Sequence, residues 1–364
     1  MKVVLICAPG VDFGESRSSM GRFLMHVAGS LKALGCRVII LSAKELAIAK
    51  LNNPLLKFFS RMRVPWLAIY WIYAFKVWRS AGYPLMVPTS QEWVVPFGFS
   101  KQIPIYHDLT QYFYPRHRKT ALYYRYYLRW VSGKLALVYC VSNSTGRMVR
   151  RLLGGVNYRV CGVPIDREFL KRGDESTVGE RFHFVWVGTL GEHKNYRGVL
   201  DYVHSIADAT ANVAMIISRV DVALLNHEIR ARRLGERIKV FSNLSDHDLS
   251  GIYRRSETVL STSQLEGFCM PVLEAALCGC IPVVPNRATF RENFGRFGVL
   301  VPPHDAAYSN YIKIANAKVD RQKVMEDAQA LHKTICERWR ISMGEITTTA
   351  VLGRTNEIIQ GRQQ

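Results

Sequence analysis

Short apolar segments alternate with helix-forming segments along most of the chain, and this alternation is the strongest constraint on its fold. Between the apolar segments, stretches such as residues 20–35 place apolar residues at helical spacing. Such alternation favours parallel sheets that helices cover on both faces. The expected strands are 2–8, 36–42, 103–109, 135–142 and 157–164 in the first half, then 181–188, 213–218, 237–242, 258–263 and 280–285 in the second. With a turn-rich junction near residues 162–173, they predict an α/β protein with two doubly wound domains.

The chain has 364 residues, which is enough for two domains that each bury a core. We expect a first domain at residues 1–167 and a second at 168–345. The segment 326–360 is typical of helices, and residues 346–364 are expected to form a C-terminal helix that returns to the first domain. Ligands of doubly wound sheets bind beyond the carboxyl ends of the strands. The loops after the strands, in two domains that face each other across a cleft, should therefore carry the functional residues.

Positive charge is concentrated in the first half of the chain. The net charge is +20, and the first 170 residues hold 24 Lys or Arg but only 7 Asp or Glu. Such a one-sided field predicts an anionic partner: a phospholipid surface, a pyrophosphate-linked lipid or a nucleic acid. Residues 116–134 interleave basic residues with tyrosines and a tryptophan. That pattern suits a lipid interface, a nucleic-acid surface or an ordinary helix with a charged face.

Three further features bear on the compartment. The longest apolar stretch, residues 64–78, is too short to span a bilayer without strain and contains Lys76. Residues 55–79 are expected to form either an interfacial helix or a buried helix of an α/β domain. The apolar start of the chain is too short for a signal peptide and is typical of a first strand. Eight cysteines without a C-x-x-C pair indicate reduced thiols, not a disulfide framework or a zinc site. We therefore expect a cytoplasmic protein.

The most informative motif is EGFCMPVLE, which starts at Glu266 and ends at Glu274. It follows an apolar run, so its first residues open a loop that leads from a strand into a helix. Backbone N–H groups at Gly267, Phe268 and Cys269 would then face an anion or a hydroxyl-rich ligand. The two carboxylates, eight residues apart, suit the vicinal hydroxyls of a sugar and of a ribose. The motif therefore predicts a site for a sugar-containing ligand.

Together with the AALCGCIPVV that follows, this motif resembles the E-x7-E signature of retaining GT-B glycosyltransferases, specifically glycosyltransferase family 4. VWVGTLGEHKN (185–195) resembles the strand–Gly–loop–Lys element of the family, and YHDL (106–109) resembles its first-domain His-Asp segment. VSNSTGRMVRRLLG, CGVPID and ERIKVFSNLSDHDL also match the family, and in the same order. The resemblance spans nearly the whole chain and implies the GT-B fold.

The resemblance also implies a role for each matching residue. The second domain would hold a nucleotide sugar, with Glu274 on the ribose hydroxyls, Glu266 on the transferred sugar and Lys194 on the diphosphate. In the first domain, His107 would help to position the sugar. His107, Glu266 and Lys194 are the expected catalytic residues. The expected donor-binding residues are Gly21, Gly188, Thr189, His193, Lys194, Arg219, Leu244, Glu266, Gly267, Phe268, Cys269, Met270 and Glu274.

Two positions depart from the family pattern. Many members have Gly-Arg where this chain has Gly188 and Thr189, so another cation must offset the phosphate charge; His193, Arg197 and Arg219 are the candidates. The glycine pair that the family has after its first strand is Ser-Ser-Met-Gly here. This segment, which ends at Gly21, predicts either a phosphate cradle or a helix capped by its serines, Ser18 and Ser19.

The resemblance implies retaining, metal-independent glycosyl transfer in which the leaving phosphate takes the acceptor's proton. The donor itself is the only small molecule required. The HDL and GTL variants resemble bacterial polysaccharide mannosyl-, rhamnosyl- and fucosyltransferases, so GDP-mannose is the first candidate donor. The expected acceptor is a glycan or a polyprenyl-diphosphate-linked saccharide at the anionic inner face of the cytoplasmic membrane, with no nucleic-acid partner. Alternatives are a sugar-nucleotide epimerase or phosphorylase of the same fold and a basic nucleic-acid-binding protein. The chain lacks the G-x-G-x-x-G and Walker A motifs, which argues against a dinucleotide or P-loop site.

Overall fold

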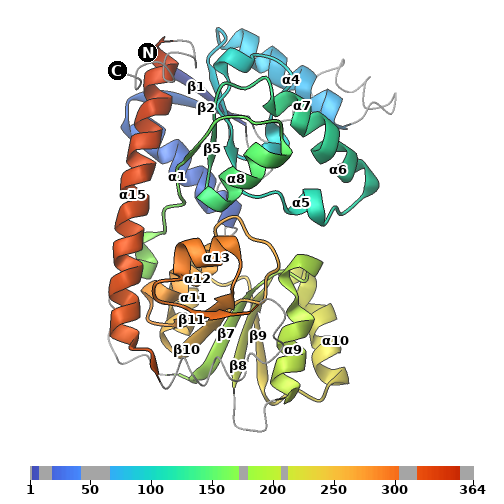
Figure 1. Cartoon of the computed structure of the whole chain (residues 1–364), viewed down its shortest axis with the longest axis vertical. Coiled ribbons are helices and arrows are strands. Elements are labelled where there is room, and N and C mark those ends of the chain that lie inside the picture. Colours follow the sequence, from blue (N-terminus) through green and yellow to red (C-terminus); the bar gives the residue numbers. More distant parts are fainter. Residues whose placement is uncertain are drawn as a thin grey trace. The chain divides into compact units, whose positions relative to one another are not determined.

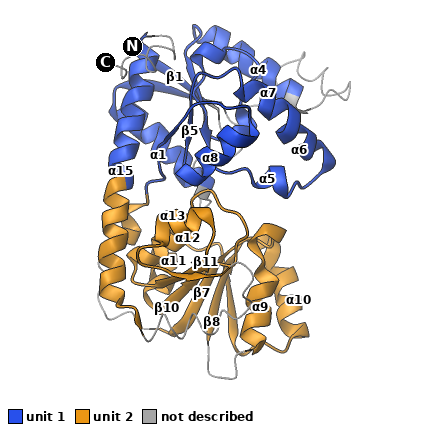
Figure 2. Ribbon diagram, viewed as in Figure 1, with its two compact units in different colours: residues 1–164, 335–364 blue, residues 165–334 orange. Residues whose placement is uncertain are grey.

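The computed structural model describes residues 2–7, 19–41, 66–171, 179–205, 212–302 and 318–352. The chain forms two compact units (Figure 2): unit 1 is Met1–Pro164 with Ile335–Gln364, and unit 2 is Ile165–Thr334. The first boundary lies close to the expected one at 167/168. The second lies at 334/335 instead of 345/346, because helix α15 (Arg321–Leu352) is uninterrupted and its part from Ile335 onwards belongs to unit 1.

Unit 1 is built on parallel strands (Figure 1). Its strands are β1 (Lys2–Cys7), β2 (Cys36–Leu41), β3 (Leu85–Pro88), β4 (Ile105–Tyr106), β5 (Val138–Cys140) and β6 (Tyr158–Val160). They pair in the orders β2-β1-β3 and β4-β5-β6. A parallel bridge between Met86 and Gln102, and a 3.0 Å hydrogen bond from the Ile103 amide to the Met86 carbonyl, connect β3 to the residues just before β4. The two short sheets are therefore joined side by side.

The helices of unit 1 are α1 (Ser19–Ala33), α4 (Trp66–Ser80), α5 (Thr110–Phe113), α6 (Arg118–Leu122), α7 (Leu128–Ser132) and α8 (Asn143–Leu152). A π-helical turn, Tyr123–Tyr127, joins α6 to α7. Helix α1 buries Phe23, Val27 and Leu31 at the spacing that the sequence predicted. The part of α15 that belongs to unit 1 packs beside α1, where Trp339 donates a 2.9 Å hydrogen bond to Ser30 Oγ. This helix therefore returns to the first unit earlier than expected.

Unit 2 contains one parallel sheet of six strands in the order β12-β11-β10-β7-β8-β9. The strands are β7 (Phe182–Gly188), β8 (Val213–Ile217), β9 (Ile238–Ser242), β10 (Ser256–Leu260), β11 (Ile281–Pro285) and β12 (Val299–Val301). Strands β8 and β11 are buried at every residue, as expected for a sheet covered on both faces. The helices are α9 (Tyr196–Ser205), α10 (Val222–Ala231), α11 (Asp246–Arg254), α12 (Met270–Leu277), α13 (Ala288–Phe294) and the first part of α15. Because all strands run the same way, their carboxyl ends share one edge.

The structure confirms the predicted α/β class, and each of the ten expected segments contains residues of a strand. Two strands, β3 and β12, were not predicted. Each is short, with four and three residues, and each borders a proline, so the apolar runs are too brief to stand out. The segment 103–109 contributes only the two-residue strand β4.

Several expectations fall partly outside the described residues: Ser18 with most of the loop after β1, residues 55–65 of the apolar stretch, and residues 353–364 of the C-terminal segment. Within the described ranges, no helix combines the length and apolarity needed to cross a membrane. The seven cysteines whose side chains are described carry free thiols, and six of them are buried. No group of three His, Cys, Asp or Glu side chains in these ranges is placed to hold a metal ion.

Candidate functional site

The carboxyl edge of the unit 2 sheet brings together loops that are distant in sequence. Strand β7 ends at Gly188 and the loop after it contains Thr189 to Lys194, while the loop after β10 runs through Glu266 to the start of α12. Arg219 follows β8 and Leu244 follows β9, so all predicted donor residues of the second half lie at this edge or in α12. Gly21 is separate from them: it belongs to unit 1 and is buried as the third residue of α1.

Lys194 and Glu266 form an ion pair, with their side chains 19% and 12% exposed. The hydroxyl of Thr262 donates a 2.7 Å hydrogen bond to the carbonyl of Lys194, and the indole of Trp186 donates to the same hydroxyl over 3.2 Å. On the other side, the hydroxyl of Thr289 donates a 2.8 Å hydrogen bond to the carbonyl of Glu266. Side chains from β7, the β10 loop and α13 thus fix the backbone of both charged residues. An ammonium and a carboxylate held this way can bind a phosphate oxygen and a sugar hydroxyl, respectively.

Close packing requires glycine at two positions, Gly188 at the end of β7 and Gly191 in the loop that follows. A Cβ on Gly188 would lie 2.7 Å from the ring of Trp186. A Cβ on Gly191 would lie 2.9 Å from Cε1 of His193 and 3.5 Å from the hydroxyl of Thr189. The imidazole of His193 and the Thr189 side chain therefore lie beside the same backbone position. Three cations were predicted to substitute for the family's arginine. Of these, His193 is the one whose side chain lies close to Thr189, the residue at the arginine position.

The other two predicted cations lie differently. The guanidinium of Arg197 is bound to Glu228 on α10, with an Nη2–Oε1 distance of 2.8 Å, and packs over the ring of Tyr196 at 5.2 Å. It would have to leave this ion pair to reach a ligand. Arg219 is exposed in the short turn after β8. Neither residue has the support from the β7 and β10 loops that Lys194 has.

Arg287, which the sequence reasoning did not single out, belongs to this edge. It follows β11, and its Nη2 donates to the side-chain oxygen of Gln264. Gln264 in turn donates its backbone N–H to the carbonyl of His193 over 2.6 Å. The Nε atom of Arg287 is buried without a hydrogen-bond partner among the described residues. The signal that could have found Arg287 is its place two residues after an apolar strand.

The residues after Glu266 turn their side chains into unit 2. Phe268, Cys269 and Met270 are all buried, and Cys269 has a left-handed backbone with φ +70° just before α12 begins. Burial, and next the charge of Glu266, raise the pKa of the Cys269 thiol, which therefore stays protonated at neutral pH. Gly267 is buried as well, so in this conformation the segment from Gly267 to Met270 is covered by protein.

Glu274 is the fifth residue of α12 and is only 1% exposed. The hydroxyl of Tyr253 on α11 is 3.5 Å from its carboxylate, at the outer limit of a hydrogen bond. In this conformation, protein atoms cover the carboxylate that was predicted to bind a ribose. A ribose hydroxyl can reach it only if side chains around it, such as Tyr253, give way.

In unit 1, His107 follows β4 directly and is held by three neighbouring segments. Its Nε2 lies 2.9 Å from the carbonyl of Thr89, so Nε2 carries the proton and donates it. The ring of Phe23 packs against it edge-on at 4.3 Å, and the hydroxyl of Thr145 donates to its carbonyl over 3.1 Å. Burial lowers the pKa of His107 more than neighbouring Asp108 and the Thr89 carbonyl raise it. The imidazole is therefore neutral at pH 7, which leaves Nδ1 as a hydrogen-bond acceptor.

Comparison with known proteins finds similarity to glycosyltransferases. The sequence profile described as "Glycosyl transferases group 1" matches residues 168–329. The O-antigen chain mannosyltransferase B of Escherichia coli is 23% identical over 249 residues, which are 63% of this chain and 65% of that protein. The tRNA-queuosine alpha-mannosyltransferase of Drosophila melanogaster is 24% identical over 132 residues, 35% of each chain. This chain thus spans less than two thirds of either relative.

Solved structures show the same fold over almost the full length. The sucrose-phosphate synthase of Thermosynechococcus elongatus matches with a TM-score of 0.73 at 15% identity, covering 97% of this chain and 100% of that one. HepE of Anabaena, solved with UDP-glucose, matches with a TM-score of 0.67 at 17% identity, covering 96% and 99%. Residues 168–329 thus match the group 1 glycosyl transferase model, and the chain has the GT-B fold of these solved structures.

Proposed function

We propose that this chain is a glycosyltransferase that moves a hexose, with mannose from GDP-mannose as the first candidate, from a nucleotide sugar held by unit 2. The observation that carries the proposal is the ion pair of Lys194 and Glu266 at the carboxyl edge of the sheet. When the donor binds, Lys194 would leave this ion pair and bind the diphosphate. Glu266 would then accept hydrogen bonds from hydroxyls of the sugar. The names of the two mannosyltransferase relatives support mannose.

The reaction we propose retains the anomeric configuration. The bond between the anomeric carbon and the diphosphate oxygen breaks, the acceptor oxygen bonds to the same face of that carbon, and the acceptor's proton passes to the departing diphosphate. Lys194 stabilises the charge that develops on the leaving group. One fixed donor of this kind typically contributes about 3 kcal/mol, or about a hundredfold in rate. Side-chain cations, and no metal ion, are proposed to neutralise the diphosphate.

Arg287 and His193 are the cations we propose in place of the arginine that Thr189 replaces. Both connect to Gln264, Arg287 through its guanidinium and His193 through its carbonyl. A planar guanidinium can donate to two phosphate oxygens at once, and Arg287 would have to turn away from Gln264 to do so. In unit 1, His107 has only Nδ1 left as an acceptor, which suits a sugar hydroxyl. The nucleoside contact of Glu274 would require the side chains that cover it to move.

The proposed acceptor is a lipid-linked or free oligosaccharide in the assembly of a bacterial surface polysaccharide, with the enzyme peripheral on the anionic inner face of the membrane. The positive charge of the first half and the O-antigen name of the Escherichia coli relative support this choice. The Drosophila melanogaster relative makes a nucleoside of tRNA the second candidate acceptor.

A donor-binding screen tests the proposal first. The full chain is heated with GDP, UDP, ADP or NAD, and the unfolding temperature is recorded. A ligand at a hundred times its Kd stabilises by about 2.7 kcal/mol, which is easily measured. We expect a nucleoside diphosphate, GDP first, to raise the temperature and NAD to leave it unchanged. Stabilisation by NAD alone would contradict the proposal.

Transfer is then measured with radiolabelled GDP-mannose, UDP-glucose and UDP-N-acetylglucosamine, each with a bacterial lipid extract or with tRNA as acceptor. Label in the lipid fraction supports the first acceptor, and label in tRNA selects the second. The Arg287→Gln variant should weaken GDP binding at least tenfold while leaving guanosine binding unchanged. Arg291→Gln, one turn further along α13, is the matched control. Equal GDP affinity in both variants would remove Arg287 from the site.

A further inference from the structure

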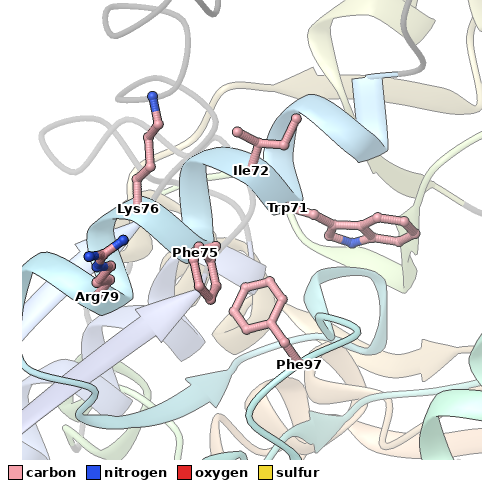
Figure 3. A pocket seen from close by; sticks show the side chains of 6 residues that line it. All are labelled: Trp71, Ile72, Phe75, Lys76, Arg79 and Phe97. Atoms are coloured by element: carbon pink, nitrogen blue, oxygen red, sulfur yellow. The ribbon is translucent and has the colours of Figure 1, made fainter.

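Helix α4 of unit 1 carries a groove that the donor site does not use (Figure 3). Five residues of the helix and one from the segment after β3 line a cavity of about 420 Å³: Trp71, Ile72, Phe75, Lys76, Arg79 and Phe97. All are described residues of unit 1, so the groove belongs to one unit. Four of the lining side chains are apolar, and the other two, Lys76 and Arg79, are cations at the edge of the groove. An apolar trough with a few charged groups at its edge is the usual form of a site for an amphiphilic small molecule.

The groove exists because α4 has two different apolar faces. Ile69, Tyr70, Ala74 and Trp78 point into the core of unit 1 and are buried. Phe75 points away from that core and stays 41% exposed, with its ring edge-on to Phe97 at 5.3 Å. The expected buried helix is thus confirmed for one face of α4, and the expected interfacial helix stays a prediction for the other. A second apolar face on a surface helix indicates a partner.

Neither cation of the groove is within ion-pair distance of an acid among the described residues. Lys76 and Arg79 are exposed, and neither forms an ion pair within the described ranges. The described acids of unit 1 include Asp108, which accepts from the Thr110 amide, and Glu345, which is bound to Arg159 at 2.7 Å. The groove therefore presents two cations that form no ion pair with a described acid, and this favours an anionic ligand.

The groove continues into a second apolar and basic surface. Trp71 stacks on Tyr127 of the π-helical turn, with ring centres 4.9 Å apart, and Tyr127 is 6.2 Å from Trp130 of α7. Beside it, Leu122, Tyr126 and Trp130 follow one another at four-residue spacing and are 51%, 69% and 50% exposed. Arg118, Arg125 and Arg129 border them and are exposed. Aromatic rings between basic residues are typical of a protein surface at the headgroup level of a bilayer.

We propose that the α4 groove binds an anionic phospholipid of the membrane, with an acyl chain along Phe75, Phe97 and Trp71 and the phosphate on Lys76 and Arg79. The proposal rests on the proposed function only in placing the enzyme at a membrane. Long basic side chains lie along apolar surface and extend their charge to the headgroups. The groove then anchors unit 1 while unit 2 binds the donor.

The experiment measures partition of the full chain onto vesicles by sedimentation, without any nucleotide sugar. Vesicles of pure phosphatidylcholine are compared with vesicles that contain phosphatidylglycerol. Each basic residue near an anionic surface contributes about fivefold to partition. The Lys76→Gln/Arg79→Gln variant should therefore lose about 25-fold on the anionic vesicles. The control, Arg338→Gln/Arg340→Gln, removes the same charge from exposed positions on α15 of the same unit and should lose clearly less.

Phe75→Ser separates insertion of the acyl chain from general attraction of charge. It changes no charge, and because Phe75 is 41% exposed and lies outside the core of unit 1, the variant should still fold, with a modest fall in unfolding temperature from the lost contact with Phe97. We expect it to reduce binding to anionic vesicles at least fivefold. Equal losses in the two charge variants, or full binding by Phe75→Ser, would overturn the proposal. So would equal binding to both vesicle types, or displacement from vesicles by tRNA at equal phosphate. GDP binding, measured on the same samples, reports separately on the donor site.

Discussion

A double substitution at Lys194 and Glu266 separates catalysis from structure. The two side chains are 19% and 12% exposed and pair with one another in the absence of ligand. Lys194→Met leaves the carboxylate of Glu266 without its cation, and Glu266→Gln leaves the ammonium without its anion. Each single change should reduce the free energy of unfolding by about 1–3 kcal/mol, the usual cost of stranding a mostly buried polar group. The double variant should return to within about 1 kcal/mol of the wild type, because neither charge is left unpaired.

Activity should follow the opposite pattern. If Lys194 stabilises the departing diphosphate, Lys194→Met loses about 2.7–4 kcal/mol of transition-state stabilisation, which is about 10²–10³ in kcat. The double variant lacks the same cation, so it should be no more active than Lys194→Met although it is more stable. Urea unfolding gives the stability, and release of labelled sugar from GDP-mannose gives kcat. Recovery of activity together with stability in the double variant would show that the pair only supports the loops.

Further predictions concern residues that position the site. Burial keeps the pKa of His107 below its ordinary 6.5, so below that pH the unfolded chain binds a proton that the fold excludes, and stability falls. His107→Gln should reduce the stability difference between about pH 7.5 and about pH 5.5 in urea unfolding; an unchanged difference refutes the lowered pKa. Gly188→Ala forces a Cβ to within 2.7 Å of Trp186 and should cost about 1–3 kcal/mol in thermal unfolding. Gly251→Ala, in a helix with open space around it, should stabilise by about 0.4–1 kcal/mol, and a loss there would contradict this packing argument. Thr262→Val removes the hydroxyl that holds the Lys194 carbonyl; we expect about 1 kcal/mol lower stability and weaker GDP binding by calorimetry, and unchanged affinity would mean that this hydrogen bond does not orient the lysine.

Local sequence pattern was enough to predict the elements that present the site. Alternating apolar runs located ten of the twelve strands among the described residues, and the E-x7-E motif placed Glu266 in a loop before a helix. Strands as short as β3 and β12 were not predicted, because three or four apolar residues beside a proline are too few to show an alternating pattern. The single continuous α15 also escaped, because the path of a long helix between two units depends on packing that no local window contains.

Contacts between distant segments could not be predicted from the sequence. Lys194 meets Glu266 because β10 lies beside β7 in the sheet, although 72 residues separate them. Arg287 joins the same edge because β11 is the next strand. The state of His107 depends on Thr89, which directly follows β3, and on Phe23 of α1. Strand order and packing determine these partners, and the spacing of residues along a single sequence specifies neither.

The burial of Glu274 is the clearest case where motif and structure differ. The motif identifies an acidic residue suited to a ribose, yet its position in α12 beside Tyr253 leaves it 1% exposed. A carboxylate covered this well needs a polar partner, and the hydroxyl of Tyr253 is within 3.5 Å. A contact between Glu274 and a donor therefore requires side chains around α11 and α12 to move.

A crystal structure of the full chain with GDP-mannose tests the central claim most directly. We expect the ammonium of Lys194 to lie within about 3 Å of a diphosphate oxygen, with Glu266 accepting hydrogen bonds from the mannose. Arg287 should lie beside the same diphosphate. A donor bound elsewhere, with Lys194 and Glu266 still paired to one another as they are without ligand, would contradict the account.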